Sequence, residues 1–125
     1  MKIEFMVEGT PTSKFSKVND VAWKILFQQE MIRVFAENDV AYLMPQEISL
    51  RFYFKAQQGE MQDSPFYKKP DIDNLTKNVL DICYGGKYSE FVPGGDQTIW
   101  KLSAEKRFSD TDSYTEITIV GIPFA

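Results

Sequence analysis

Two aspartates stand two residues apart in the stretch KPDIDNLTKNVLD, which runs from Lys69 to Asp81. Asp71 and Asp73 come just before a segment with helical spacing, so two carboxylates crowd at the start of a helix. A helix N-terminus favours one anion, but two neighbouring carboxylates repel each other unless a positive charge lies between them. The pair therefore indicates either one cap beside a solvated neighbour or a site for a metal ion.

Asp73 by itself has an ordinary explanation as the N-cap of a helix expected to begin near Asn74. Asp71 is harder to explain in this way. Residues two apart in an extended segment project to the same side, and Pro70 favours an extended approach to the helix. Both carboxylates would then face one small volume, as a metal site requires.

Lys77 and Asp96 are the other side chains that could do chemistry. Lys77 follows Asp73 by about one helical turn, a spacing that is also typical of an ordinary surface ion pair. Asp96 lies in a glycine-rich loop before a strand, where it is either a turn residue or a third oxygen ligand for a hard divalent cation. An EF-hand is excluded, because counting from Asp71 puts leucine, threonine and isoleucine at positions that need an oxygen ligand, glycine and glutamate.

The composition excludes several kinds of active site. The chain has 125 residues, no histidine and one cysteine, Cys83. The absence of histidine rules out Ser-His-Asp triads, Cys-His pairs, histidine zinc sites and histidine general bases. We expect Cys83 to be a small packed side chain. Acid–base or metal chemistry must therefore use Asp, Glu, Lys or Tyr.

Net charge and hydropathy constrain the function less. The formal net charge of −4 argues against a nonspecific nucleic-acid coat, but not against a nuclease, because a bound cation offsets clustered carboxylates. No apolar run approaches the length of a membrane span, and the opening MKIEFMVEG lacks the apolar core of a secretion signal. We therefore expect a soluble, cytoplasmic protein.

The hydrophobic pattern predicts one α+β domain over residues 1–125. Alternation predicts strands at residues 2–8, 48–56, 98–108 and 114–121, the third with alternating Trp100, Leu102, Ala104 and Phe108. Helical spacing predicts one helix near Asn74–Cys83 and another over residues 19–39, with a shared face of Val21, Ile25, Ile32, Phe35 and Ala36. The order β-α-β-α-β-β predicts a small mixed sheet with two helices packed on it.

The stretch KPDIDNLTKNVLD resembles the signature of the RusA family of Holliday junction resolvases, which runs roughly Asp-x-Asp-Asn-Leu-x-Lys-x-x-x-Asp. The segment GDQTIWKLSAEKRF resembles the second block of the family, in which Asp-Asp-x-Gln precedes a hydrophobic strand ending near Lys-x-Tyr. VEGTPTSK is similar to the opening strand and turn of the family. The chain departs from the pattern at Gly95, which replaces the first of two adjacent aspartates, and at Thr98, which replaces glutamine.

The resemblance implies a RusA-like fold and hydrolysis of DNA phosphodiesters that depends on Mg²⁺, for which Mn²⁺ can substitute. Carried over residue by residue, the catalytic acids and metal ligands of the family fall on Asp71, Asp73 and Asp96, and its essential lysine falls on Lys77. The resemblance also implies a homodimer that makes paired nicks in four-way DNA junctions during recombination and repair. Such a protein is expected in a bacterial or phage-infected bacterial cell, often from a prophage.

Lysines in the predicted loops are candidates for contacts with DNA phosphates: Lys14, Lys17, Lys68, Lys69 and Lys87. Each of them is equally consistent with an ordinary solvated side chain.

Three other functions remain open at this point. A nuclease of the same fold that prefers flaps or forks would have the same active site. A protein that binds branched DNA but has lost cleavage would fit the change at Gly95 and Asp96. A plain structural or interaction domain would use the same acids as caps and turns, but it leaves the joint spacing of Asp71, Asp73 and Lys77 unexplained.

Overall fold

The computed structural model describes residues 1–13, 20–84 and 95–124. Within these residues the α+β class and the predicted order of elements are confirmed. The elements are β1 (Lys2–Glu8), α1 (Asp20–Glu37), β2 (Tyr42–Lys55), α2 (Ile72–Tyr84), the short 3-10 helix η2 (Gly95–Thr98), β3 (Lys101–Ser109) and β4 (Tyr114–Phe124).

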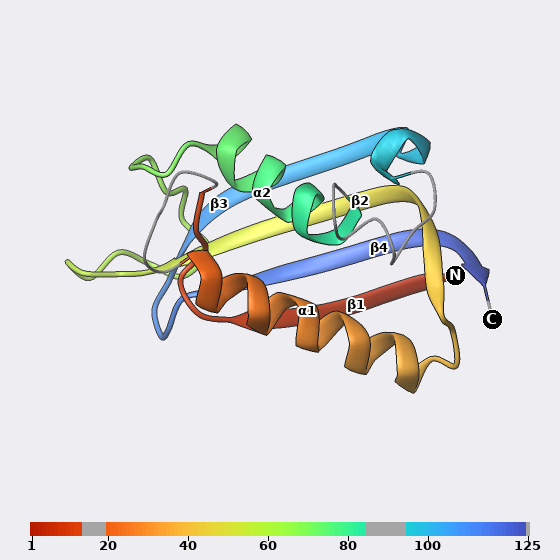
Figure 1. The fold of residues 1–125 in the computed structure, drawn as a ribbon. Coiled ribbons are helices and arrows are strands. Elements are labelled where there is room, and N and C mark those ends of the chain that lie inside the picture. The colour runs from red at the N-terminus through yellow and green to blue at the C-terminus, as the bar shows by residue number, and fades with distance from the viewer. Residues whose placement is uncertain (14–19, 85–94, 125) are drawn as a thin grey trace.

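The described strands form one mixed sheet in the order β1-β4-β2-β3. β4 is antiparallel to both of its neighbours, whereas β2 and β3 are parallel. A parallel pair needs a long crossover connection, and α2 lies in the connection between β2 and β3. Figure 1 shows α1 and α2 on the same face of the sheet, with α2 above the strands β2 and β3.

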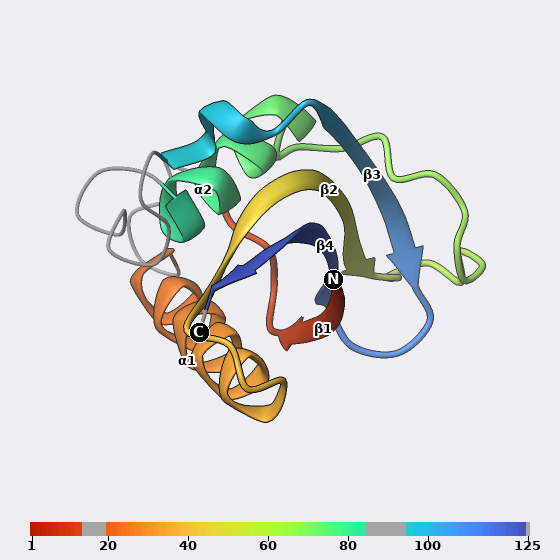
Figure 2. The ribbon, with the colours of Figure 1, turned by 90° about the vertical axis from the view of Figure 1, so that its right-hand side faces the viewer.

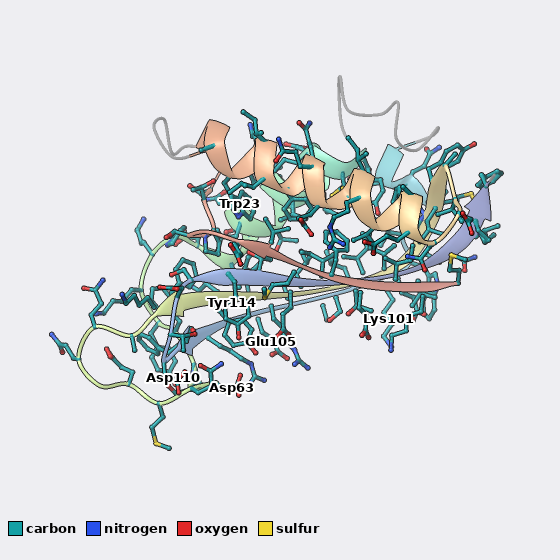
Figure 3. All side chains as sticks on the ribbon, turned by 90° about the horizontal axis from the view of Figure 1, so that it is seen from below. Trp23, Asp63, Lys101, Glu105, Asp110 and Tyr114 are labelled. Atoms are coloured by element: carbon teal, nitrogen blue, oxygen red, sulfur yellow. The ribbon has the colours of Figure 1, made fainter. Side chains whose placement is uncertain are left out.

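The core lies between the sheet and the two helices. Ile3, Phe5 and Val7 alternate as the buried side chains of β1. The ring centroid of Phe27 on α1 lies 5.9 Å from that of Phe5 and 5.5 Å from that of Trp23, both in edge-to-face geometry. The opposite face of the sheet carries charged side chains, such as Arg51 paired with Glu105 and Glu116, and Figure 3 shows Glu105 and Lys101 on the side away from α1.

The predicted buried face of α1 is largely wrong. Ile25 and Ile32 are 48% and 56% exposed, and Ala36 is also exposed. The side chains that α1 buries are Trp23, Phe27, Met31, Val34 and Phe35, so only Phe35 was placed correctly. α1 is apolar on more than one side, so its spacing allowed two stripes, and the stripe with the larger aromatic area faces the sheet. The side chain of Val21 lies outside the described residues.

Several predicted boundaries also differ from the structure. β2 begins at Tyr42 rather than at residue 48, because it continues through an irregularity between Pro45 and Glu47 that the alternation did not show. α2 begins at Ile72 rather than near Asn74. β3 begins at Lys101, so Trp100 precedes it and is 72% exposed. In the described part of the chain, neither helix combines the length and the apolar character of a membrane span.

Candidate active site

The first turn of α2 positions the two aspartates differently. The backbone N–H of Leu75 donates to the carbonyl oxygen of Asp71 at 3.1 Å, so Asp71 occupies the N-cap position that was expected for Asp73. Asp73 lies inside the first turn, where the backbone N–H of Asn74 donates to its carboxylate at 2.9 Å. The positive end of the helix dipole stabilises an aspartate at this position.

The two aspartates therefore have different positions relative to the neighbouring cavity. Asp73 lines a cavity of about 540 Å³, and Asp71 is exposed outside its lining. The expected convergence of both carboxylates on one small volume stays a prediction, and so does a catalytic role for Asp71.

The cavity lies between α2, η2 and β3. One face of α2 contributes Asp73, Lys77 and Asp81, and η2 contributes Asp96. Figures 1 and 2 show η2 beside the C-terminal half of α2, where the two segments, distant in sequence, lie close together. The apolar side of the cavity comes from Leu80 of α2 and from Leu102 and Ala104 of β3. Three of the four predicted catalytic residues, Asp73, Lys77 and Asp96, thus line one hollow.

Lys77 is the cationic side chain among the described residues that line the cavity. Its side chain is exposed, and in the described part of the chain it takes part in no ion pair. The surface pair with Asp73 that the spacing allowed is therefore not formed. The ammonium is available to an anion that enters from solvent.

The donors of the cavity fit a hard divalent cation in their chemistry. Among residues 1–13, 20–84 and 95–124, no three Asp, Glu or Cys side chains lie close enough together to hold one ion. Asp73 and Asp81 are two helical turns apart, about 12 Å along the axis, so they cannot both bind the same ion directly. Mg²⁺ prefers carboxylate oxygens and commonly binds through only one or two of them, keeping several waters and substrate phosphate oxygens. One or two of these aspartates would satisfy that requirement.

Asp81 is a residue that the sequence reasoning did not assign. Its side chain lines the cavity two turns after Asp73. The signal was present in the sequence, because Asp73, Lys77 and Asp81 follow each other at steps of four and steps of four share a helix face. The approach of Asp96 to this face had no comparable signal.

A second hollow lies at the end of the sheet, next to the loop that leads into Asp71. This groove, of about 920 Å³, is lined by the exposed Lys68 and Lys69 together with Lys55, which sequence reasoning missed. Phe54, Phe66 and Phe108 give it an apolar wall. The other three candidates for DNA contacts, Lys14, Lys17 and Lys87, lie outside the described residues.

Cys83 is buried in α2, as expected for a packed side chain. Burial raises the pKa of its thiol well above the ordinary range, so the thiolate is disfavoured. Cys83 is therefore no nucleophile in this structure.

Comparison with known proteins bears on what this site does. No curated protein matches the chain. The family model described as Endodeoxyribonuclease RusA matches residues 11–120, a span that includes α2, η2 and β3 and hence every described residue of the cavity. The expected family is thereby confirmed. A match over most of the 125 residues shows that the chain belongs to the RusA family of endodeoxyribonucleases, hydrolases that act on phosphodiester bonds and are associated with Holliday junctions.

Proposed function

We propose that this chain is a metal-dependent endonuclease that resolves four-way DNA junctions, with Mg²⁺ as its ion and Mn²⁺ as a substitute. The observation that supports this most is the cavity of about 540 Å³, which gathers Asp73, Lys77 and Asp96 from two separate segments of the family match. A cap or a turn explains each acid alone, but neither explains why an acid of α2 and an acid of η2 share one hollow beside a lysine.

The acidic residues and the lysine of the cavity would have different roles, because they carry opposite charges. Asp73 and Asp96, which line the cavity, would hold the cation through carboxylate oxygens, and Asp71, the N-cap of α2, would be a further ligand. A divalent cation, when bound, supplies positive charge at the scissile phosphate and activates water for attack. Lys77, one turn from Asp73 on the same face, would stabilise the negative charge that develops on the phosphate oxygens.

DNA would reach the cavity along the lysine-lined groove. Lys68 and Lys69 stand three and two residues before Asp71 in the sequence. Phosphates bound by these lysines would therefore be held near the start of α2, where the acids are. A four-way junction is two-fold symmetric and needs two matched cuts, which a homodimer with two equal sites would provide. We further propose that residues 1–125 form one domain, and that the protein acts in the bacterial cytoplasm, where its DNA substrate lies, with a prophage as a fitting source.

Cleavage of a synthetic four-way junction tests the proposal directly. The purified protein is incubated with the labelled junction in Mg²⁺, in Mn²⁺ or in EDTA, beside a linear duplex and a flap of matched sequence. We expect paired nicks in the junction with either metal, none in EDTA, and little cleavage of the duplex. Absence of junction cleavage in both metals would overturn the proposal.

The same experiment separates the alternatives. Faster cleavage of the flap than of the junction would assign the protein to flap or fork processing. Tight junction binding without cleavage would indicate a binding protein, as the replacement by Gly95 beside Asp96 allows.

A further inference from the structure

Lys106 of β3 makes a set of contacts that the proposed mechanism does not use. It is partly buried, and its ammonium donates to the carbonyl oxygens of Lys68 at 2.6 Å and of Pro70 at 2.8 Å. The same ammonium lies 5.3 Å from the ring centroid of Phe66. One side chain thus contacts three points of the loop that leads into α2.

The position of Lys106 on the sheet explains these contacts. Side chains alternate along a strand, so Lys106 is on the same face of β3 as Leu102 and Ala104, which line the acidic cavity. Unlike those two residues, Lys106 contacts the loop that precedes α2, at Lys68 and Pro70. The neighbouring Arg107 points to the other face, where it pairs with Glu105.

The loop is held by the core at one end and by Lys106 at the other. The ring of Phe66 stacks on that of Phe54 with centroids 4.2 Å apart, and the backbone N–H of Phe66 donates to the carbonyl oxygen of Lys106 at 3.0 Å. Beyond Phe66 the side chains of Tyr67, Lys68 and Lys69 are exposed. The ammonium of Lys106 therefore supplies the side-chain bonds that hold this exposed stretch against β3.

The positions of Asp71 and of the two loop lysines depend on the backbone conformation of this stretch. The carbonyl of Pro70 belongs to the same peptide as the N–H of Asp71, so a bond to that carbonyl restrains the residue that opens α2. The carbonyl of Lys68 lies between the two lysines proposed to contact phosphates. Bonds from a charged donor are shorter and stronger than neutral ones, and a lysine ammonium offers three N–H donors for such a task.

We propose that Lys106 is a positioning residue for the nuclease: it fixes the 66–70 loop so that Asp71 and the loop lysines are presented together to one DNA strand. This inference rests on the proposed function. It places Lys106 in contact with the loop backbone and not with the substrate, so its loss should change geometry rather than remove a reacting group.

The test compares Lys106→Met with Lys106→Arg, and uses Lys101→Met as the matched control on the same strand. Methionine keeps an apolar stem against Phe66 but cannot donate, whereas arginine retains the charge and the donors. Lys101 is exposed and pairs with Glu47 on the polar face, away from the loop. Junction cleavage gives kcat and KM separately, thermal unfolding reports folding, and hydrogen exchange by mass spectrometry follows residues 66–72.

For Lys106→Met we expect kcat to fall by roughly 10- to 100-fold, as for groups that orient the ligands of a metal site. We expect faster exchange in residues 66–72, a larger Mg²⁺ requirement, and a smaller change in KM. Lys106→Arg should restore most of kcat, and Lys101→Met should behave as wild type. If Lys106→Met does not fold, Lys106→Leu, which also cannot donate a hydrogen bond, takes its place.

Suppose the wild type is active but Lys106→Met keeps the wild-type kcat, or keeps the wild-type rate of hydrogen exchange in residues 66–72. Either result would overturn the role of Lys106 and leave the proposed function standing. A wild type that cleaves no junction would instead overturn the proposed function.

Discussion

Asp73 and Asp96 line the same cavity, although one lies in the first turn of α2 and the other in η2, just ahead of β3. The relationship depends on the parallel pairing of β2 with β3, because the crossover through α2 brings the helix over the strand that η2 precedes. In the proposed function, these two acids would bind the cation and Lys77, on the same cavity, would face the phosphate.

Replacing either acid by its neutral isostere should stop cleavage while sparing the fold. We expect Asp73→Asn and Asp96→Asn to lower kcat on a four-way junction by at least about 100-fold, because the loss of a metal ligand removes several kcal/mol of charge stabilisation. Junction binding, measured by gel shift in Ca²⁺, should change little. Asp39→Asn is the matched control, since Asp39 is exposed after α1 and asparagine tolerates its φ of 55°. Equal activity of Asp96→Asn and wild type would remove Asp96 from the site.

Asp71 needs its own test, because it caps α2 and does not line the cavity. If it joins the metal site when DNA binds, Asp71→Asn should abolish junction cleavage and leave junction binding intact, because asparagine remains a good N-cap. Thermal unfolding checks that the helix start is undisturbed. Full cleavage by this variant would leave Asp71 as a cap alone.

Lys77→Ala should lose activity without loss of stability. The side chain is exposed and unpaired among the described residues, so its removal costs the fold little, within about 0.5 kcal/mol. The loss of its charge at the phosphate should lower kcat by about 100-fold or more. Circular dichroism and single-turnover cleavage measure the two effects, and Lys2→Ala, at an exposed lysine of β1, is the control. Aggregation of Lys77→Ala would indicate a structural lysine.

The buried face of α1 can be tested by two truncations on one helix. Phe27 is fully buried and Ile25 is 48% exposed. Phe27→Ala should lower the free energy of unfolding by about 3–5 kcal/mol, because it leaves a cavity beside Phe5 and Trp23. Ile25→Ala should cost about 1 kcal/mol or less, since its side chain already contacts water. Chemical denaturation gives both values, and the reverse ranking would restore the face that the sequence pattern suggested.

Alkaline pH should destabilise the protein partly through Tyr53. Burial, together with its hydrogen bond to Asp63 at 2.8 Å, raises the pKa of Tyr53 from 10.0 to about 12. A group whose pKa is higher in the folded state contributes stability that is complete below its unfolded pKa. Stability should therefore fall as the pH rises from 10.0 to about 12. Tyr53→Phe should flatten this fall in urea unfolding curves, whereas Tyr67→Phe, at a residue that is 86% exposed, should leave it unchanged.

The sequence by itself determined the order of elements, the acids at the start of α2 and the family signature, because these depend on local spacing. It also excluded histidine chemistry through composition alone, whereas it is the burial of Cys83 in the structure that disfavours the thiolate. It could not fix which stripe of α1 is buried, because the helix offers two apolar stripes and only the sheet surface selects between them.

Only the tertiary structure decided which candidate residues line the same cavity and which lie outside it. The shift of the helix start to Ile72 made Asp71 the N-cap and placed Asp73 inside the first turn, and no alternation in the sequence reports a shift of two residues. The placement of Asp96 in the cavity that Asp73 also lines, and the hydrogen bonds from Lys106 to the loop, depend on strand pairing between separate segments of the chain. Such contacts form because the whole sheet and both helices pack together, and that packing is not encoded in any single stretch.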